Sequence, residues 1–276
     1  DYDFTKPDLD LTVEATADSD DDLALFDFPG GYVSPDEGKR YAQVQLEAER
    51  WPCRVVEATA SCSRLMEGRT LTLSDAPRGL DGDYLIVATK HVYAAVPARA
   101  GVTADDGMVA DAATVSSHVV LLPVDVPFRT PQRTARPIVD GPQTATVVAP
   151  EGSQPEEIHT DELGRCKVKF HWDLDDALDD RASCWIRTQQ LQTSGSMILP
   201  RVDWEVIVEF QQGDPDRPIV TGRMHNARFP PPYELPKGKT RTSIGSRTSP
   251  GGAGGNEIRF EDKAGNEEIE LKAGKN

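Results

Sequence analysis

The sequence predicts a mainly β protein with an α+β first segment, a small closed barrel and a short final β segment. Runs that alternate apolar and polar residues recur in the second half of the chain, which is typical of half-buried strands. A strong helix signal occurs near Ser34. Proline and glycine divide the chain, with seven prolines between Pro123 and Pro155 and clusters at 230–232 and 251–255.

These breaks predict the domain organisation. We expect an α+β domain at 1–128, an extended linker at 129–155, a barrel at 156–225, a flexible Pro/Gly-rich linker at 226–255 and the start of a further β structure at 256–276.

The first segment contains both helix and strand signals. Ser34-Pro35-Asp36-Glu37 combines an N-cap hydroxyl, a proline at the first helical position and a glutamate three residues after the cap, so we expect a helix to about Arg50. Strands are expected at 70–73, 84–93 and 119–128, and loops at 18–22 and 101–111. Because the acidic first residues lack an initiator Met and an apolar core, we expect no signal peptide and a chain that starts within a longer protein.

The second segment alternates strongly between apolar and polar residues. Cys166 and the residues that follow it place apolar side chains on one face of a strand, and a second such strand follows Val202. Further short strands are expected at 183–188, 197–199 and 218–224. About five short antiparallel strands in about 70 residues predict a closed barrel of the OB type. Its predicted core is Val168, Phe170, Trp172, Trp204, Val206, Val208 and Phe210.

The third segment has too few apolar residues to fold alone. Ile258 and Phe260 alternate with charged residues, and after a turn Ile269 and Leu271 do the same. A two-stranded hairpin of this kind is marginal in water. Several copies around one axis would bury the same few side chains. We therefore predict that Ile258, Phe260, Ile269 and Leu271 form the core of a trimeric needle.

The charge excludes several function classes. The chain has 46 acidic and 30 basic side chains and a formal charge of −16, which argues against binding to nucleic acid or to anionic membranes. Trp172, Trp185 and Trp204 could serve as base-stacking platforms on an OB barrel, but acidic neighbours would repel phosphates. The longest apolar stretch is broken by Pro123 and is much shorter than the roughly 20 residues of a membrane helix, so we expect a soluble chain.

No catalytic or cofactor motif is found in the sequence. There is no Walker loop, H-E-x-x-H, G-x-S-x-G or dinucleotide fingerprint, and the glycine cluster at 251–255 lacks the setting of a phosphate loop. A metal or acid–base cluster can be imagined from His159, Asp161, Glu162, His171 and Asp173, but their spacing favours solvated surface. His91 and His118 are expected to pack rather than to bind a ligand. We expect no catalytic, metal or cofactor-binding residue.

The four cysteines are too few for a disulfide framework, and none forms a C-x-x-C pair. Cys166 and Cys184 lie on neighbouring predicted strands, which raises a disulfide or a nucleophile as alternatives. Free cysteine is among the most buried residue types, so we favour two buried structural thiols.

Four motifs of the barrel segment stand out: Gly164–Asp173, Ser183–Arg187, Leu199–Arg201 and Gly213–Gly222. They resemble motifs of the VgrG family, the trimeric spikes of bacterial type VI secretion systems. Further matches follow at 231–236, 239–241, 249–252 and 256–263, and others precede the barrel at 29–32, 125–129 and 141–145. The resemblance implies the later part of a phage-tail-hub-like domain at 1–128, an OB-fold neck and the start of a trimeric triple-stranded β-helix.

The implied function is mechanical. A homotrimeric spike would cap the Hcp tube on the baseplate proteins, carry a PAAR-repeat tip protein and effectors, and puncture target membranes. It would lie in the bacterial cytoplasm before firing and then be secreted or injected. The alternatives are a spike of a phage tail or extracellular contractile particle, or a phage-type spike with peptidoglycan-hydrolase activity. Only about 30 residues separate barrel from needle, fewer than an inserted enzyme domain needs, so this segment is not expected to be an enzyme.

Overall fold

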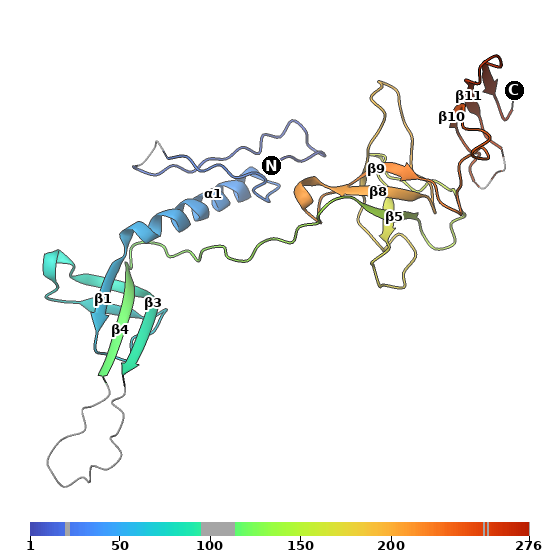
Figure 1. Ribbon diagram of the computed structural model, residues 1–276. Helices are drawn as coiled ribbons and strands as arrows, with labels where there is room; N and C mark the ends of the chain where they lie inside the picture. The colour runs from blue at the N-terminus through green and yellow to red at the C-terminus, as the bar shows by residue number, and fades with distance from the viewer. Residues whose placement is uncertain (20–22, 95–113, 251, 253, 276) are drawn as a thin grey trace, which may run out of the picture. The chain divides into compact units, whose positions relative to one another are not determined.

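The computed structural model describes residues 1–19, 23–94, 114–250, 252 and 254–275 (Figure 1). The predicted loop at 101–111 and part of that at 18–22 lie outside these residues. The chain divides into two compact units, Asp1–Thr134 and Ala135–Asn276. In the part of the chain that is described, no helix has the length and apolar character needed to cross a membrane.

The first unit contains the predicted helix. Helix α1 (Pro35–Arg50) begins at the N-cap Ser34, whose Oγ accepts a hydrogen bond from the Glu37 backbone N–H at 3.3 Å, so the helix prediction is confirmed. The short 3-10 turn η1 (Trp51–Arg54) follows. The indole of Trp51 donates to the Arg129 carbonyl at 2.8 Å and meets the Phe128 ring edge-on at 5.0 Å, which ties the helix end to the segment after the sheet.

An antiparallel sheet completes the first unit, in the order β1-β4-β3-β2 (Figure 1). Its strands are β1 (Val56–Ala60), β2 (Thr70–Leu73), β3 (Gly82–Ala94) and β4 (Thr114–Pro123), with the 3-10 turn η2 (Pro77–Gly79) before β3. Tyr84, Ile86, Val119 and Leu121 form its core. The predictions for β2 and β3 are confirmed, β1 was not predicted, and the strand expected at 119–128 lies earlier because the chain turns after Pro123, where Val126 N–H bonds to the Pro123 carbonyl.

The barrel of the second unit has the strand order β6-β5-β8-β9-β7. The strands are β5 (Gln143–Val148), β6 (Lys167–Phe170), β7 (Arg187–Thr188), β8 (Glu205–Phe210) and β9 (Pro218–Met224), and the 3-10 turn η3 (Gln211–Gly213) joins β8 to β9. Cys166 N–H donates to the Ile186 carbonyl at 3.0 Å and Ile186 N–H donates back at 2.8 Å, which joins the ends of the sheet beside β6 and β7. The predicted five-stranded OB-type barrel is confirmed.

Three details of the barrel prediction are wrong. Strand β5 lies within the residues predicted as an extended linker, yet it pairs with both β6 and β8. Strand β7 pairs with β9 in parallel, whereas antiparallel pairing was expected. No strand forms at 197–199, because the Gln190 side-chain amide bonds to both the N–H and the carbonyl of Ile198 in place of a partner strand.

The barrel core consists of small and medium apolar residues. Its buried residues are Ala145, Val147, Cys166, Val168, Ile186, Val206, Val208 and Val220, against which Phe170, Trp204 and Phe210 pack. Trp172, predicted in this core, is 62% exposed, so its assignment is corrected. Strand β6 ends at Phe170, and Asp173 N–H bonds back to the Phe170 carbonyl, which turns Trp172 outward to stack on the Phe170 ring at 5.0 Å.

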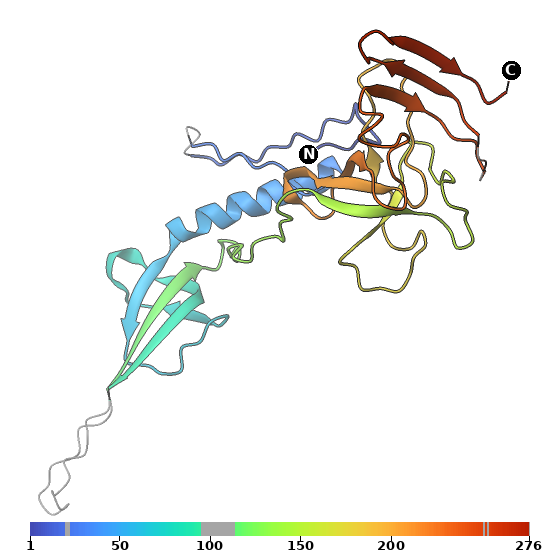
Figure 2. The ribbon, with the colours of Figure 1, turned by 45° about the vertical axis from the view of Figure 1, so that its right-hand side comes forward.

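The second unit ends in a three-stranded antiparallel sheet, β10 (Arg241–Gly245), β11 (Glu257–Glu261) and β12 (Glu268–Lys272), whose strands lie side by side in Figure 2. Strands β11 and β12 were predicted. Strand β10 was not, because it lies in the Pro/Gly-rich stretch expected to be a flexible linker.

Truncating a barrel-core residue tests the packing. We expect Val208→Ala to lower the free energy of unfolding by about 2 kcal/mol, because Val208 is fully buried and the smaller side chain leaves a cavity. Val124→Ala is the matched control at a 55% exposed position, with an expected change within about 0.5 kcal/mol. Urea unfolding followed by tryptophan fluorescence measures both. Equal losses for the two variants would contradict this core.

Candidate functional site

One side of the last sheet exposes a row of apolar residues. In the observed register Ile244 pairs with Ile258 and Ile258 with Leu271, while Phe260 pairs with Ile269. Paired residues in an antiparallel sheet project from the same side, and residues two apart along a strand share that side. The five residues therefore form one surface, here named the apolar face: Ile244, Ile258, Phe260, Ile269 and Leu271.

The apolar face is exposed in the single chain. Exposure is 69% for Ile269, 76% for Leu271 and 61% for Ile244, and it is 43% for Ile258 and 38% for Phe260. Large apolar side chains gathered on one surface mark an interaction site more often than apolar residues scattered singly. The structure thus brings together all four residues predicted for the needle core, and their role in a trimer stays a prediction.

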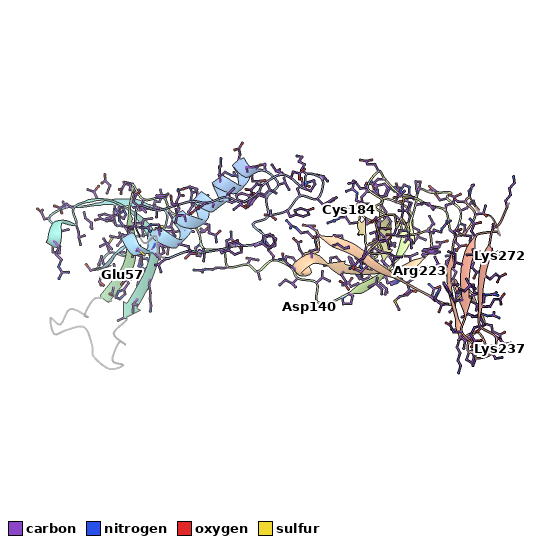
Figure 3. All side chains as sticks on the ribbon, turned by 90° about the horizontal axis from the view of Figure 1, so that it is seen from above. Glu57, Asp140, Cys184, Arg223, Lys237 and Lys272 are labelled. Atoms are coloured by element: carbon purple, nitrogen blue, oxygen red, sulfur yellow. The ribbon has the colours of Figure 1, made fainter. Side chains whose placement is uncertain are left out.

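The opposite side of the sheet is charged. Arg259 Nη2 lies 2.6 Å from Glu270 and 3.5 Å from Glu268, and Arg241 Nε lies 3.0 Å from Glu261. Hydrogen bonds from Thr240 and then Arg241 lower the pKa of the Glu261 carboxyl. The side chain of Lys272, labelled in Figure 3, belongs to this side of β12. One side of the sheet is thus adapted to water and the other to an apolar partner.

Ile244 is the member of the apolar face that sequence reasoning missed. It lies on β10, inside a stretch of prolines and glycines that was assigned to a linker. A short period-2 pattern could have predicted this strand. Thr242 and Ile244 alternate there with Arg241, Ser243 and Gly245.

The residues considered for metal binding have separate partners. They are His159, Asp161, Glu162, His171 and Asp173. Asp161 accepts from Arg165 Nε at 2.6 Å, Asp173 lies 2.9 Å from Lys169, and His159 faces Asp180 at 3.6 Å. Glu162 and His171 are exposed. Among the described residues, no three His, Cys, Asp or Glu side chains are grouped as a metal site would require.

The two lone histidines of the first unit join hydrogen-bond networks. His91 Nδ1 lies 2.7 Å from Ser117 Oγ, and its Nε2 lies 3.0 Å from the Leu65 carbonyl. His118 Nδ1 lies 3.1 Å from Thr59 Oγ1. Both rings therefore connect neighbouring segments of the sheet.

Two lysines of β6 hold the acidic loop at 171–182. Lys167 Nζ donates to the Asp180 carbonyl at 2.7 Å. Lys169 is only 8% exposed, and its Nζ donates to the Asp175 carbonyl and lies 2.9 Å from the Asp173 carboxylate. The sequence placed both lysines on the polar side of the strand. There they anchor a loop instead of facing only water.

The two cysteines of the barrel differ in environment. Cys166 is 1% exposed, and burial raises the pKa of its thiol to about 11. Cys184, labelled in Figure 3, is exposed, which corrects the expectation that both thiols are buried. Both are free thiols.

Three family models match the chain in order. Residues 1–97 match the phage tail baseplate hub (GPD), residues 155–225 the type VI secretion system/phage-baseplate injector OB domain, and residues 242–276 the bacteriophage T4 gp5 C-terminal trimerisation domain. The third match covers β11, β12 and all of β10 except its first residue. The apolar face thus lies in the part of the chain that resembles a trimerisation domain.

Curated relatives match over the whole chain. The type VI secretion system spike protein VgrG1b of Pseudomonas aeruginosa is 40% identical over 100% of this chain and 37% of its own length. VgrG3 of Vibrio cholerae is 38% identical over 100% of this chain and 27% of its length. The actin cross-linking toxin VgrG1 of Vibrio cholerae is 36% identical over 100% of this chain and 25% of its length. The chain therefore spans well under half the length of these relatives.

Two solved structures show weaker likenesses. The Escherichia coli c3393 protein, described as a type VI secretion component similar to T4 tail proteins gp27 and gp5, aligns with a TM-score of 0.46 at 19% identity, over 70% of this chain and 45% of that chain. A Francisella PdpA–VgrG complex aligns with a TM-score of 0.44 at 8% identity, over 79% of this chain and 41% of that chain. These likenesses are too weak to bear on the assignment.

A hub domain, an OB domain and a trimerisation domain in this order define a hub-and-spike protein. The mainly β fold, the barrel and the final sheet agree with that class. Similarity over the whole of this chain then makes the family resemblance specific: the chain is similar to VgrG spike proteins at 40% and 38% identity. The resemblance found in the sequence and the predicted fold class are both confirmed.

Thiol labelling tests the barrel closure. We expect iodoacetamide at pH 8 to label Cys184 readily and Cys166 on the order of 100-fold more slowly, because the thiolate is the reactive form and burial raises the pKa of Cys166 to about 11. Mass spectrometry of peptides from the native protein gives both rates, and a urea-unfolded sample is the control in which they converge. Equal rates in the native protein would show that the barrel is open beside Cys166.

Proposed function

We propose that the protein containing this chain is a homotrimeric spike of a contractile injection machine, in which three copies pack their apolar faces around one axis. The observation that carries the proposal is the apolar face itself, which is exposed in one chain and lies in a segment similar to a trimerisation domain. Each of its side chains gains about 1 kcal/mol when its remaining apolar surface leaves water. These side chains are exposed among the described residues, and a sheet this small needs a further packed layer to be stable in water.

The proposed role is mechanical. The spike caps the Hcp tube at the baseplate, is driven through a target membrane, and carries effectors and a PAAR-repeat protein at its tip. The relatives named as type VI secretion spike proteins support this assignment. The protein resides in the bacterial cytoplasm before firing and is then secreted or injected. A spike of a phage tail or extracellular contractile particle is the alternative, supported by the phage-derived family models at both ends of the chain.

We propose no catalytic role for this segment. Its matches are to hub, OB and trimerisation domains. The rival is a phage-type spike with peptidoglycan-hydrolase activity between barrel and needle. Against that rival, β10 lies within the interval, and Ser246, the residue after it, donates its backbone N–H to the Asn256 carbonyl. Peptidoglycan turnover that depended on residues of that interval would establish the rival.

Polar substitution of the apolar face tests the trimer. We expect the full-length protein to scatter light as a trimer and the variant Ile258→Ser, Phe260→Ser, Ile269→Ser, Leu271→Ser to associate at least tenfold more weakly, because serine removes the apolar surface to be buried. The matched control, Glu268→Gln with Lys272→Gln, changes the opposite side without altering net charge and should leave association unchanged. A folded monomer of the unsubstituted protein would contradict the proposal.

The charge predicts the direction of the salt effect. Three copies of the chain carry a formal net charge of −48, three times the −16 of one copy, so self-repulsion opposes assembly. Salt shortens the Debye length from about 10 Å at 0.1 M to about 3 Å at 1 M. We therefore expect trimer dissociation, measured by light scattering on dilution, to become weaker as NaCl increases. Stronger dissociation in salt would indicate that ion pairs, and not apolar contacts, hold the trimer.

A further inference from the structure

Glu156 connects three parts of the second unit. It lies in the loop between β5 and β6, and its backbone N–H donates to the Val202 carbonyl at 3.1 Å. Its carboxylate accepts from the Trp204 indole Nε1 at 3.3 Å and, through the other oxygen, pairs with Arg247 Nε at 2.9 Å. Val202 and Trp204 precede β8, whereas Arg247 lies in the connection from β10 to β11. One side chain thus links the barrel to the segment that enters the last sheet.

Arg201 makes a second link beside the first. Its Nη1 donates to the Glu156 carbonyl at 2.9 Å, and its Nη2 donates to the Arg247 carbonyl at 3.0 Å. The rigid fork of a guanidinium fixes the relative positions of two acceptors. Arg247 is therefore held at both its side chain and its backbone.

The Glu156 carboxylate is shielded from water. Its side chain is 15% exposed, against 54% for Arg247. The indole that donates to it is covered by the guanidinium of Arg223, labelled in Figure 3, which lies 3.5 Å from the Trp204 ring centroid. Charge-assisted hydrogen bonds are stronger in such a setting than at a fully hydrated surface.

The backbone at Glu156 adopts a conformation that favours glycine. Its φ is +62°, in the left-handed region that costs free energy for a residue with a Cβ atom. Glycine would remove that cost but also the carboxylate. The glutamate at this position indicates that the two carboxylate contacts offset the strain.

The connection that Arg247 belongs to is closely packed where it is described. Ser246 N–H donates to the Asn256 carbonyl at 2.8 Å, and Thr248 N–H donates to the Gly254 carbonyl at 2.9 Å. A Cβ atom on Gly255 would lie 2.0 Å from the Ser246 carbonyl oxygen, so this close approach requires glycine. These contacts correct the expectation of a flexible linker at this position.

We propose that Glu156 is a joint residue, which fastens the connection between β10 and β11 to the barrel through Arg247. If the protein acts as the proposed spike, force along the last sheet passes into the barrel through this ion pair as well as through the peptide chain. The joint itself is a property of one chain and does not depend on the trimer.

The test is amide hydrogen exchange in the full-length protein. Glu156→Gln keeps an acceptor for the indole but removes the charge that holds Arg247, so we expect exchange at the Ser246 and Thr248 amides to be about five- to tenfold faster. Glu157→Gln is the matched control, because among the described residues the Glu157 carboxylate makes no hydrogen bond or ion pair. Exchange at the Ser246 and Thr248 amides should be unchanged in this variant. Unchanged exchange in Glu156→Gln, or an equal increase in the control, would overturn the joint.

Arg247→Gln gives an independent check that leaves the β5–β6 loop intact. It should speed exchange as much as Glu156→Gln does, and the double variant should add little, because both single changes break the same pair. Additive effects would refute the pairing.

Light scattering on the same samples separates the two proposals. A trimer whose exchange is unaffected by Glu156→Gln refutes the joint alone. A monomer with accelerated exchange refutes the spike alone.

Discussion

The backbone pairing of Cys166 with Ile186 is the contact on which the second unit depends. Without it β6 and β7 would be the open edges of a curved sheet, each presenting unpaired N–H and carbonyl groups. With it the sheet closes, and the valine-rich interior is fully enclosed. Closure also fixes where the chain leaves each strand. Glu156 reaches Trp204 from the loop between β5 and β6, and Lys169 holds the acidic loop beside β6.

The same alternation of apolar and polar residues has two outcomes in this unit. In the barrel the apolar side chains face the interior, where Val168 and Val208 are completely buried. Among the residues that the structure describes, no second layer covers the apolar face of β10–β12, so an equally regular pattern leaves its side chains in solvent. The difference lies in the number of strands and in closure, not in the period. The apolar face that is exposed in one chain is thus the same surface that we propose to be buried around the axis of the trimer.

Sequence reasoning found the elements with strong local signals and missed those that depend on neighbours. The Ser34 cap predicted α1, and the period-2 runs predicted β8, β11 and β12. Strands β5 and β10 were missed because nearby prolines and glycines outweighed a short apolar pattern, although β5 pairs with both β6 and β8 and β10 pairs with β11. Trp172 was misplaced because the alternation was extended beyond the turn that ends β6. The Glu156 contacts join residues about 45 to 90 positions apart, which no local pattern reveals.

The lysine anchors of β6 have a consequence for how freely the acidic loop can change. Lys167 and Lys169 grip the loop at the main-chain oxygens of Asp180 and Asp175, and every residue type carries such an oxygen. These two attachments are therefore independent of the loop's side chains, whereas the ion pair of Lys169 with the Asp173 carboxylate is not. Leu174 and Leu178, 95% and 78% exposed, lie between or beside these anchor points. Sequence drift among homologues, or grafting of a foreign peptide, can alter the loop's surface while its two points of attachment persist.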